Sequence, residues 1–253
     1  AIGTRSDLKR HVGTDEGVVA KEKALGAAVD TWWREHQMGI SHLGKDKQLM
    51  QLRADLLSSF QDAVRPVGVL DRFQVAGVIA SWWGDTQNDL KTIAARGFTG
   101  LVESWEASIV NALEDKASKG NGLDHKLVKR LVPDYLADIE ELRANKADLE
   151  ATLKSATDGG AEDEEDGKDG AEEISEEELR AAKKDLAAVN TTMKRLQKQF
   201  VAQLQNARSE LDETSAQELV LGILAAELQA ILNRYVAGHR GPVSYTHLRA
   251  HET

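Results

Sequence analysis

The histidines of this chain are its best candidates for metal ligands, because the sequence contains no cysteine. Zinc motifs such as HExxH place two imidazoles on one face of a helix. His36 and His42 are six residues apart with a glycine between them, and this spacing does not align them. The absence of cysteine also excludes a disulfide framework, a thiol nucleophile and thiolate metal sites. We therefore expect no metal site.

Carboxylates are the other groups that could do chemistry, and they are most concentrated in DGGAEDEEDGKDGAEE, residues 158–173. General acid–base catalysis needs two groups held at a fixed geometry with shifted pKa values, which a segment of glycine and like charges does not provide. The sequence also lacks a G-x-S-x-G elbow and a glycine-rich loop between a strand and a helix. We expect no catalytic residue and no cofactor bound by these residues themselves.

Two tryptophan pairs, Trp32-Trp33 and Trp82-Trp83, are the most conspicuous aromatic residues. Adjacent helical positions point about 100° apart, so one indole of each pair can occupy a core while the other reaches a second neighbour. Core packing is the interpretation that we favour. The alternative is that the indoles stack on bases or anchor an interface.

Composition favours an all-α fold. The 253 residues are 41% hydrophobic and 5% aromatic and include only three prolines, while alternating runs of β-branched residues are scarce. The formal net charge of −10 argues against a stand-alone DNA-binding module. The local cluster HKLVKR, residues 125–130, could still touch phosphate, although such clusters are more often a solvated helix face.

The longest apolar stretch, Leu219 to Leu232, contains Glu227 and Gln229. It falls short of the roughly 20 residues that a membrane span requires, so we expect no membrane partner. The absence of cysteine favours a cytoplasmic location.

The first half, residues 1–120, reads as a helical domain. We predict helices over Asp15–His36, over Asp46–Ala63 and from Leu70, and then a break at Gly84 to Thr86 with Thr86 as N-cap. Gly97 should end that helix, and another should begin near Thr99. The predicted core residues of the first and third helices are Val19, Leu25, Val29, Trp32 and Trp33, and Phe73, Ala76, Val78, Ile79, Trp82 and Trp83.

The second half predicts a long antiparallel coiled-coil hairpin. Its first arm covers 121–157, an acidic flexible tip covers 158–174, and the second arm with a closing helix covers 175–241. Apolar residues recur every three or four positions, which is the period of a coiled coil, with Lys146 inside the seam of the first arm. The seam residues are Tyr135, Ile139, Leu142, Leu149 and Leu153 in the first arm and Leu179, Ala182, Leu186, Val189, Met193, Leu196 and Phe200 in the second.

Two capping boxes mark helix starts in the second arm. Ser175 with Glu178 predicts its start, and Ile174 and Leu179 are placed for a hydrophobic staple there. Ser215 with Glu218 predicts a restart of the helix. The closing segment is apolar over too wide an arc for a two-stranded seam. We therefore expect it to pack into the helical domain.

Several stretches resemble the C-terminal region of the modification subunit of type I restriction-modification systems. They are GVIASWWGDTQNDLKTIAARGFTGLVESWEASIV (77–110), LDRFQVAGVIASWW, LVPDYL (131–136) and the closing ELQAILNRYV, and they cover about residues 55–240. In that family the subunit is a DNA adenine-N6 methyltransferase. Its upstream domain binds S-adenosylmethionine through a glycine-rich loop and grips the flipped adenine with an Asn/Asp-Pro-Pro-aromatic tetrapeptide.

Neither catalytic motif of the family is present in this sequence. Its three prolines, Pro66, Pro133 and Pro242, are never adjacent, so the tetrapeptide is absent. The resemblance therefore implies a non-catalytic segment that docks the parent enzyme on the DNA specificity subunit. The restriction subunit is a further candidate partner, DNA is reached through the whole complex, and S-adenosylmethionine is implied only for the full-length parent.

The last residues, VSYTHLRAHET (243–253), are similar to a translated sequencing-library adapter whose join falls within the codon of Pro242. We expect the natural sequence to stop near Gly241 and residues 242–253 to be an artefact of that adapter. The first residues, AIGTRSDLKR, have neither an initiator methionine nor a signal peptide. We expect a gene fragment that is cut at both ends.

The leading hypothesis is an assembly segment that buries part of a heptad seam against partner helices. A non-catalytic coiled-coil adaptor or tethering protein is the alternative, and a nucleic-acid clamp is a third, against which the acidic balance argues. The expected partner-interface residues are Trp82, Trp83, Tyr135, Ile139, Leu142, Leu186, Val189, Met193, Leu196 and Phe200.

Overall fold

The computed structural model describes residues 15–46, 48–114, 122–158 and 176–250, with the side chains of 44–46, 156–158, 176 and 239–250 left out. No strand occurs in these ranges, which confirms the all-α fold class. The helices are α2 (Glu16–Asp46), α3 (Leu49–Val64), the 3-10 turn η1 (Arg65–Val67), α4 (Arg72–Glu114), α5 (Val128–Leu131), α6 (Pro133–Asp158), α7 (Glu176–Ser209) and α8 (Glu213–Ala250).

The chain divides into two compact units. Unit 1 combines Ala1–Ser104 with Leu211–Thr253, and unit 2 is Trp105–Glu210. The sequence placed a boundary near residue 120 and assigned the closing helix to the second arm, whereas these units assign Trp105 onward to unit 2 and α8 to unit 1. The predicted tip, apart from Asp158, and Ser175 of the predicted capping box lie outside the described residues.

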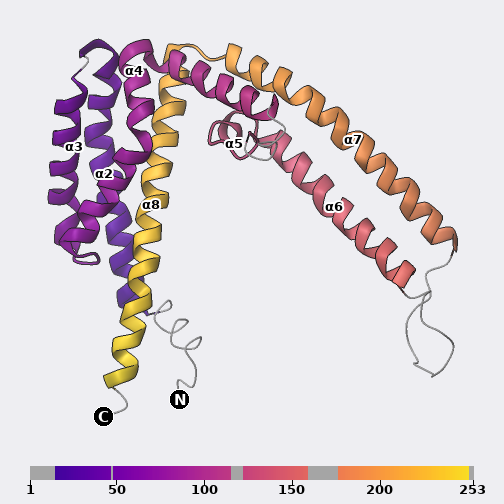
Figure 1. Cartoon of the computed structure of the whole chain (residues 1–253). Helices are drawn as coiled ribbons and strands as arrows, with labels where there is room; N and C mark the ends of the chain where they lie inside the picture. Colours follow the sequence, from indigo (N-terminus) through magenta and orange to yellow (C-terminus); the bar gives the residue numbers. More distant parts are fainter. Residues whose placement is uncertain (1–14, 47, 115–121, 159–175, 251–253) are drawn as a thin grey trace. The chain divides into compact units, whose positions relative to one another are not determined.

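Unit 1 is an antiparallel bundle of α2, α3, the first part of α4 and α8 (Figure 1). The Trp32 Nε1–H donates to Ser59 Oγ of α3 at 2.9 Å, and the rings of Trp33 and Trp82 meet edge to face at 5.9 Å. The Trp82 Nε1–H donates to the Leu224 carbonyl of α8 at 2.9 Å. Each indole therefore joins two helices by a polar or aromatic contact as well as by burial.

All four paired tryptophans are buried in unit 1, which confirms the core interpretation. Trp32 and Trp82 are 1% and 0% exposed, while their neighbours Trp33 and Trp83 are 9% and 8% exposed. The division of each pair between the centre and the edge of the core follows from the angle between adjacent helical positions.

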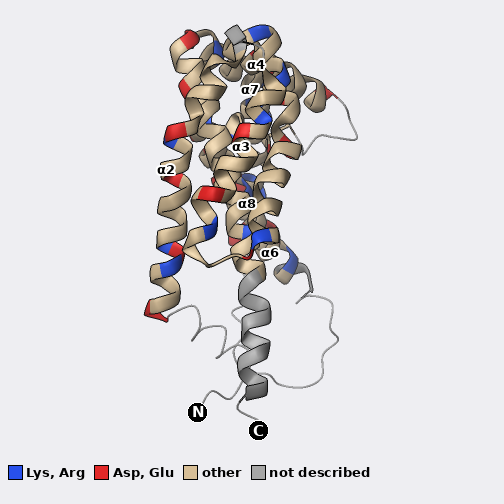
Figure 2. Ribbon diagram, turned by 90° about the vertical axis from the view of Figure 1, so that its left-hand side faces the viewer, with Lys and Arg blue, Asp and Glu red and all other residues tan. Residues whose placement is uncertain are grey.

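Two predicted core residues are wrong. Val19 and Phe73 are 47% and 72% exposed, because each lies within the first turn of its helix, and the guanidinium of Arg72 lies 4.5 Å from the Phe73 ring centroid. Helix α2 also continues ten residues past the predicted end at His36, to Asp46. Cations and carboxylates are interspersed along its solvent side (Figure 2).

The predicted break at Gly84 to Thr86 is also wrong, because α4 is continuous there. Thr86 is fully buried, and its hydroxyl donates to the Trp82 carbonyl at 2.7 Å. A threonine that bonds the carbonyl four residues earlier is satisfied inside a helix and does not cap its start. Gly84 keeps helical geometry on the exposed side.

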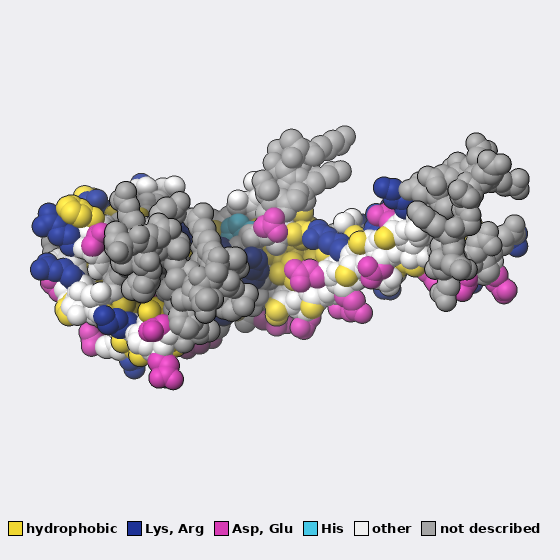
Figure 3. Space-filling view, turned by 90° about the horizontal axis from the view of Figure 1, so that it is seen from below, with side chains coloured by type: hydrophobic (Ala, Val, Ile, Leu, Met, Phe, Trp, Pro, Cys, Tyr) yellow, Lys and Arg dark blue, Asp and Glu magenta, His cyan; other side chains and the backbone are white. Residues whose placement is uncertain are grey.

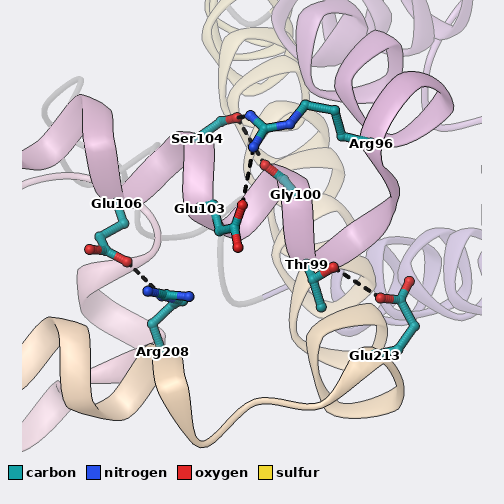
Figure 4. A network of polar contacts seen from close by, with 8 residues as sticks. All are labelled: Arg96, Thr99, Gly100, Glu103, Ser104, Glu106, Arg208 and Glu213. Atoms are coloured by element: carbon teal, nitrogen blue, oxygen red, sulfur yellow. Dashed lines mark hydrogen bonds and ion pairs between the residues drawn. The ribbon is translucent and has the colours of Figure 1, made fainter.

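The predicted stop at Gly97 is confirmed as a sharp break inside α4. Gly97 has φ 76° and ψ −176°, a conformation that is essentially restricted to glycine. Arg96 spans the break, since its guanidinium donates to Ser104 Oγ at 2.8 Å and to Glu103 Oε2 at 3.1 Å (Figure 4). The Thr99 hydroxyl donates to Glu213 Oε2 at 3.1 Å, which connects the break to the start of α8.

Helix α8 begins at Glu213, and its N-cap lies three residues before the predicted N-cap Ser215. Asp212 is the cap: its Oδ1 accepts the Ser215 N–H at 2.8 Å, and the Asp212 N–H donates back to Ser215 Oγ at 2.9 Å. The Ser215 hydroxyl, and after it the Ser215 N–H, hold the pKa of Asp212 below its ordinary value. A reciprocal pair of this kind satisfies two donors that a helix start leaves unpaired.

Helix α8 packs into unit 1. The Tyr235 ring lies against Gly77 of α4, where a Cβ would approach the Tyr235 hydroxyl to 2.6 Å. Residues Glu213–Gly238 are long and apolar enough to cross a membrane, with mean hydropathy 1.4, which differs from the expectation that no segment meets that length. The large apolar side chains of this segment, however, lie in the core: Val220, Leu221, Ile223, Leu224, Leu228, Ile231 and Leu232.

Gly84 and Gly97, two of the glycines of α4, allow a matched pair of substitutions. Gly84→Ala should raise the free energy of unfolding of unit 1 by up to about 1 kcal/mol, because alanine favours helix and a Cβ there meets nothing within 4 Å. Gly97→Ala should lower it by about 1–3 kcal/mol, because alanine is strained at this φ. Urea unfolding followed by tryptophan fluorescence measures both. Equal destabilisation by the two substitutions would contradict a continuous α4 at Gly84.

Candidate interaction surface

The main element of unit 2 is an antiparallel pair formed by α6 and α7, which lie side by side (Figure 1). Tyr135, near the start of α6, packs on Phe200, near the end of α7, with ring centroids 4.6 Å apart and an interplanar angle of 40°. This contact sets an antiparallel register. Coiled-coil supercoiling of the pair stays a prediction, with which the helical hairpin is compatible.

Burial along both helices follows the predicted seam. Tyr135, Ile139, Val189 and Phe200 are buried, between 1% and 8% exposed. Most of the remaining positions on the two helices are exposed. The other seam leucines and a methionine are half-buried: Leu142, Leu149, Leu153, Leu179, Leu186, Met193 and Leu196.

Lys146 occupies the predicted polar position of the seam and is half-buried. Its ammonium lies 3.6 Å from Glu150 Oε1, one turn further along α6. A lysine can bury its methylene stem along an apolar stripe while keeping its charge at the edge. The pairing with Glu150 holds the charge on the surface of α6.

The Tyr135 hydroxyl is buried without a hydrogen-bond partner among the described residues. Burial disfavours the phenolate and raises the pKa of Tyr135 above its ordinary value near 10, while the charge of Arg143 acts in the opposite direction. An unpaired buried hydroxyl costs stability. The ring therefore stabilises the hairpin, and the oxygen opposes it.

The sequence analysis did not predict the contacts that Trp105 and Glu106, at the start of unit 2, make with residues farther along the chain. Trp105, in the last part of α4, has the Lys126 ammonium 4.7 Å from its ring centroid and the His125 ring at 6.0 Å. Arg208 Nε donates to Glu106 Oε2 at 2.7 Å, and the Glu106 side chain is 12% exposed (Figure 4). The adjacent Trp105 and Glu106 could have been noticed as one apolar and one charged anchor, but their partners are about 20 and 100 residues away.

The outer side of α6 is acidic. Glu140, Glu141 and Asp148 are exposed there among alanines, and carboxylates line this part of the hairpin in Figure 3. Like charges of this kind keep a helix face solvated.

The ten predicted interface residues fall in two groups. Trp82 and Trp83 belong to unit 1, where their own chain covers them. The other eight belong to unit 2 and form the α6–α7 seam. Of these, only Leu142, Leu186, Met193 and Leu196 keep partly exposed surface that a further helix could cover.

Groups capable of chemistry are not gathered in the described parts of the chain. His36 stacks on Trp32 at 5.1 Å, and its Nδ1 lies 2.9 Å from the Trp32 carbonyl, which is a local packing role. His42 is exposed. Across the described ranges no three His, Asp or Glu side chains are close enough to hold a metal ion.

Comparison of the chain with protein-family models, with curated proteins and with solved structures gave no match. The resemblance to the type I modification subunit therefore depends on the residues quoted for it.

Removal of one oxygen atom tests the seam. Tyr135→Phe should leave the free energy of unfolding unchanged or raise it by about 1 kcal/mol, because the substitution deletes an unpaired buried hydroxyl and keeps the ring contact with Phe200. Phe200→Ala should lower it by about 3–5 kcal/mol. Urea unfolding followed by far-ultraviolet circular dichroism measures both changes.

The pH dependence gives an independent readout of the same residue. Above pH 10 the unfolded chain releases the Tyr135 proton before the folded chain does, so stability should fall as pH rises toward the raised folded pKa. Tyr135→Phe should remove that part of the alkaline loss. A strong loss of stability in Tyr135→Phe at neutral pH would show that the hydroxyl has a partner.

Proposed function

We propose that this chain is an assembly segment, whose α6–α7 hairpin docks a larger enzyme onto the helices of a partner subunit. If the resemblance to the type I modification subunit holds, the larger enzyme is the DNA adenine-N6 methyltransferase of a type I restriction-modification system. Its partner is then the specificity subunit, with the restriction subunit as a further candidate. The proposed location is the cytoplasm.

The observation that supports docking is the half-buried seam. A two-helix hairpin covers only one side of each apolar stripe, and Leu142, Leu186 and Leu196 remain half-buried. Additional helices can bury the rest of such side chains, at about 25 cal/mol per Å² of apolar surface removed from water. Completion of a pair of helices to a bundle of four is a common arrangement.

Chemistry is assigned to residues outside this segment. S-adenosylmethionine binding and adenine recognition would belong to the parent's upstream domain, as the resemblance implies. The gene sequence upstream offers an inexpensive check: a glycine-rich cofactor loop and an Asn/Asp-Pro-Pro-aromatic tetrapeptide should be encoded there. An upstream reading frame that lacks both removes the methyltransferase assignment.

A non-catalytic coiled-coil adaptor or tethering protein is the second candidate, because the same seam would serve either role. The two candidates differ in the partner. An adaptor is not expected to bind a type I specificity subunit, whereas the assembly segment is expected to bind it.

Co-expression with the specificity subunit of the same type I system tests the proposal. The chain should co-elute with that subunit in size-exclusion chromatography. The double substitution Leu186→Ala and Leu196→Ala should weaken binding at least about tenfold, since it removes half-buried apolar surface that a partner would cover.

Two controls make the result interpretable. The pair Gln197→Ala and Gln199→Ala truncates exposed side chains of the same helix and should leave binding unchanged. Circular dichroism of every variant reports whether the hairpin remains helical. Failure of the unaltered chain to co-elute contradicts docking on a specificity subunit.

A further inference from the structure

The side of α7 opposite the seam has an unusual composition. At about 100° per residue, six cations fall within an arc of about 120° on this side. All nine side chains along it are exposed, and we call them the basic face: Arg180, Lys183, Lys184, Ala187, Ala188, Thr191, Lys194, Arg195 and Lys198. No carboxylate falls within this arc between Arg180 and Lys198, and Glu177 lies on the same side one turn before Arg180.

Five of the six cations of this face have no carboxylate partner among the described residues. In the described part of the chain no carboxylate forms an ion pair with Lys183, Lys184, Lys194, Arg195 or Lys198. Two exposed carboxylates of α7 itself lie near this face, Glu177 one turn before Arg180 and Asp185 beside Lys184 at the edge of the face. On α6 the outer side carries Glu140, Glu141 and Asp148. Between Arg180 and Lys198 the outer side of α7 is therefore basic, whereas that of α6 is mainly acidic.

The basic face also lacks the apolar groups that other kinds of partner need. Its uncharged members are Ala187, Ala188 and Thr191, and the Thr191 hydroxyl donates to the Ala187 carbonyl at 2.8 Å. A helical protein partner would find no apolar stripe to bury, and a membrane-surface helix inserts Leu, Phe or Trp side chains. A phosphate backbone needs neither, because release of counterions drives its binding.

The spacing of the cations suits duplex DNA. From Arg180 to Lys198 the face is about 27 Å long, and Lys184 and Lys194 are separated by about 15 Å along the axis. The major groove is about 12 Å wide and admits an α-helix. The two basic clusters can therefore reach phosphates on both sides of the groove, while the small central residues allow close approach.

We propose that the basic face of α7 binds the phosphate backbone of duplex DNA without reading its sequence. The chain's net charge of −10 does not prevent this contact. At 0.1 M salt the Debye length is about 10 Å, so carboxylates farther away than this act weakly on a phosphate held at this face. The two nearby carboxylates, Glu177 and Asp185, are outnumbered by the six cations. The inference concerns the chain alone and does not depend on the proposed partner subunit.

Fluorescence anisotropy with a labelled 24-base-pair DNA duplex of random sequence tests the proposal. The unaltered chain should bind at low salt, and its affinity should fall steeply as salt rises. The double reversal Lys184→Glu and Lys198→Glu should weaken binding at least tenfold at 0.1 M salt, and it should lower the slope of log affinity against log salt by about 2.

A matched reversal separates this face from net charge. Lys21→Glu and Lys23→Glu change exposed lysines of α2 by the same total charge and should alter the affinity less than twofold. Circular dichroism shows that each variant keeps its helices. Absence of duplex binding at 20 mM salt, equal losses in both double variants, or binding to phosphatidylserine vesicles but not to DNA would each overturn the proposal.

Discussion

The packing of α6 on α7 is the constraint on which the rest of unit 2 depends. Each helix has one apolar stripe, and neither stripe could be removed from water without the other. The ring contact between Tyr135 and Phe200 sets the register at one end, and Ile139 and Val189 are buried further along. Once this register is set, every remaining side chain of the two helices is assigned to an edge or to an outer side. The acidic side of α6 and the basic face of α7 are consequences of that assignment.

Unit 1 is a helical bundle built from two segments of the chain, and unit 2 is a long insertion between them. Unit 1 ends at Ser104 and resumes at Leu211, with all of unit 2 between these points in the sequence. Within unit 1, the hydrogen bond from Thr99 to Glu213 joins the segment that precedes the insertion to the segment that follows it. Gly97 provides the positive-φ backbone conformation that breaks α4 before the insertion, and Asp212 provides the helix cap that starts α8 after it.

The parts of the fold that were predicted correctly are those encoded by local periodicity. The seam from Tyr135 to Phe200 and the break at Gly97 depend on spacing and on the conformational freedom of glycine, and both can be read from neighbouring residues. The errors concern choices between equally plausible local partners. The Thr86 hydroxyl could cap a helix start or donate to a carbonyl of the preceding helical turn. Because Thr86 is buried within α4, it donates to the Trp82 carbonyl.

Tertiary contacts account for the features that the sequence could not reveal. Asp212 and Ser215 are both good cap residues, and the chain uses the first as the cap and the second as its reciprocal partner. Phe73 is exposed in the first turn of α4, although its residue type and spacing fit a core position. The pair Glu106 and Arg208 is about 100 residues apart, so its interaction follows only from the return of α7 along α6. Of the predicted interface, periodicity located the seam but did not show which of its members stay half-buried.

The most direct measurement of the account is the distance between α6 and α7 far from the Tyr135 contact. Because the chain has no cysteine, Ala151→Cys and Ala181→Cys provide two specific spin-label sites on exposed positions. Packed helices with axes about 10 Å apart predict a single narrow distribution centred at about 20–30 Å by pulsed electron paramagnetic resonance. A broad distribution extending past about 45 Å would show that the two helices splay apart, and it would contradict the shared seam.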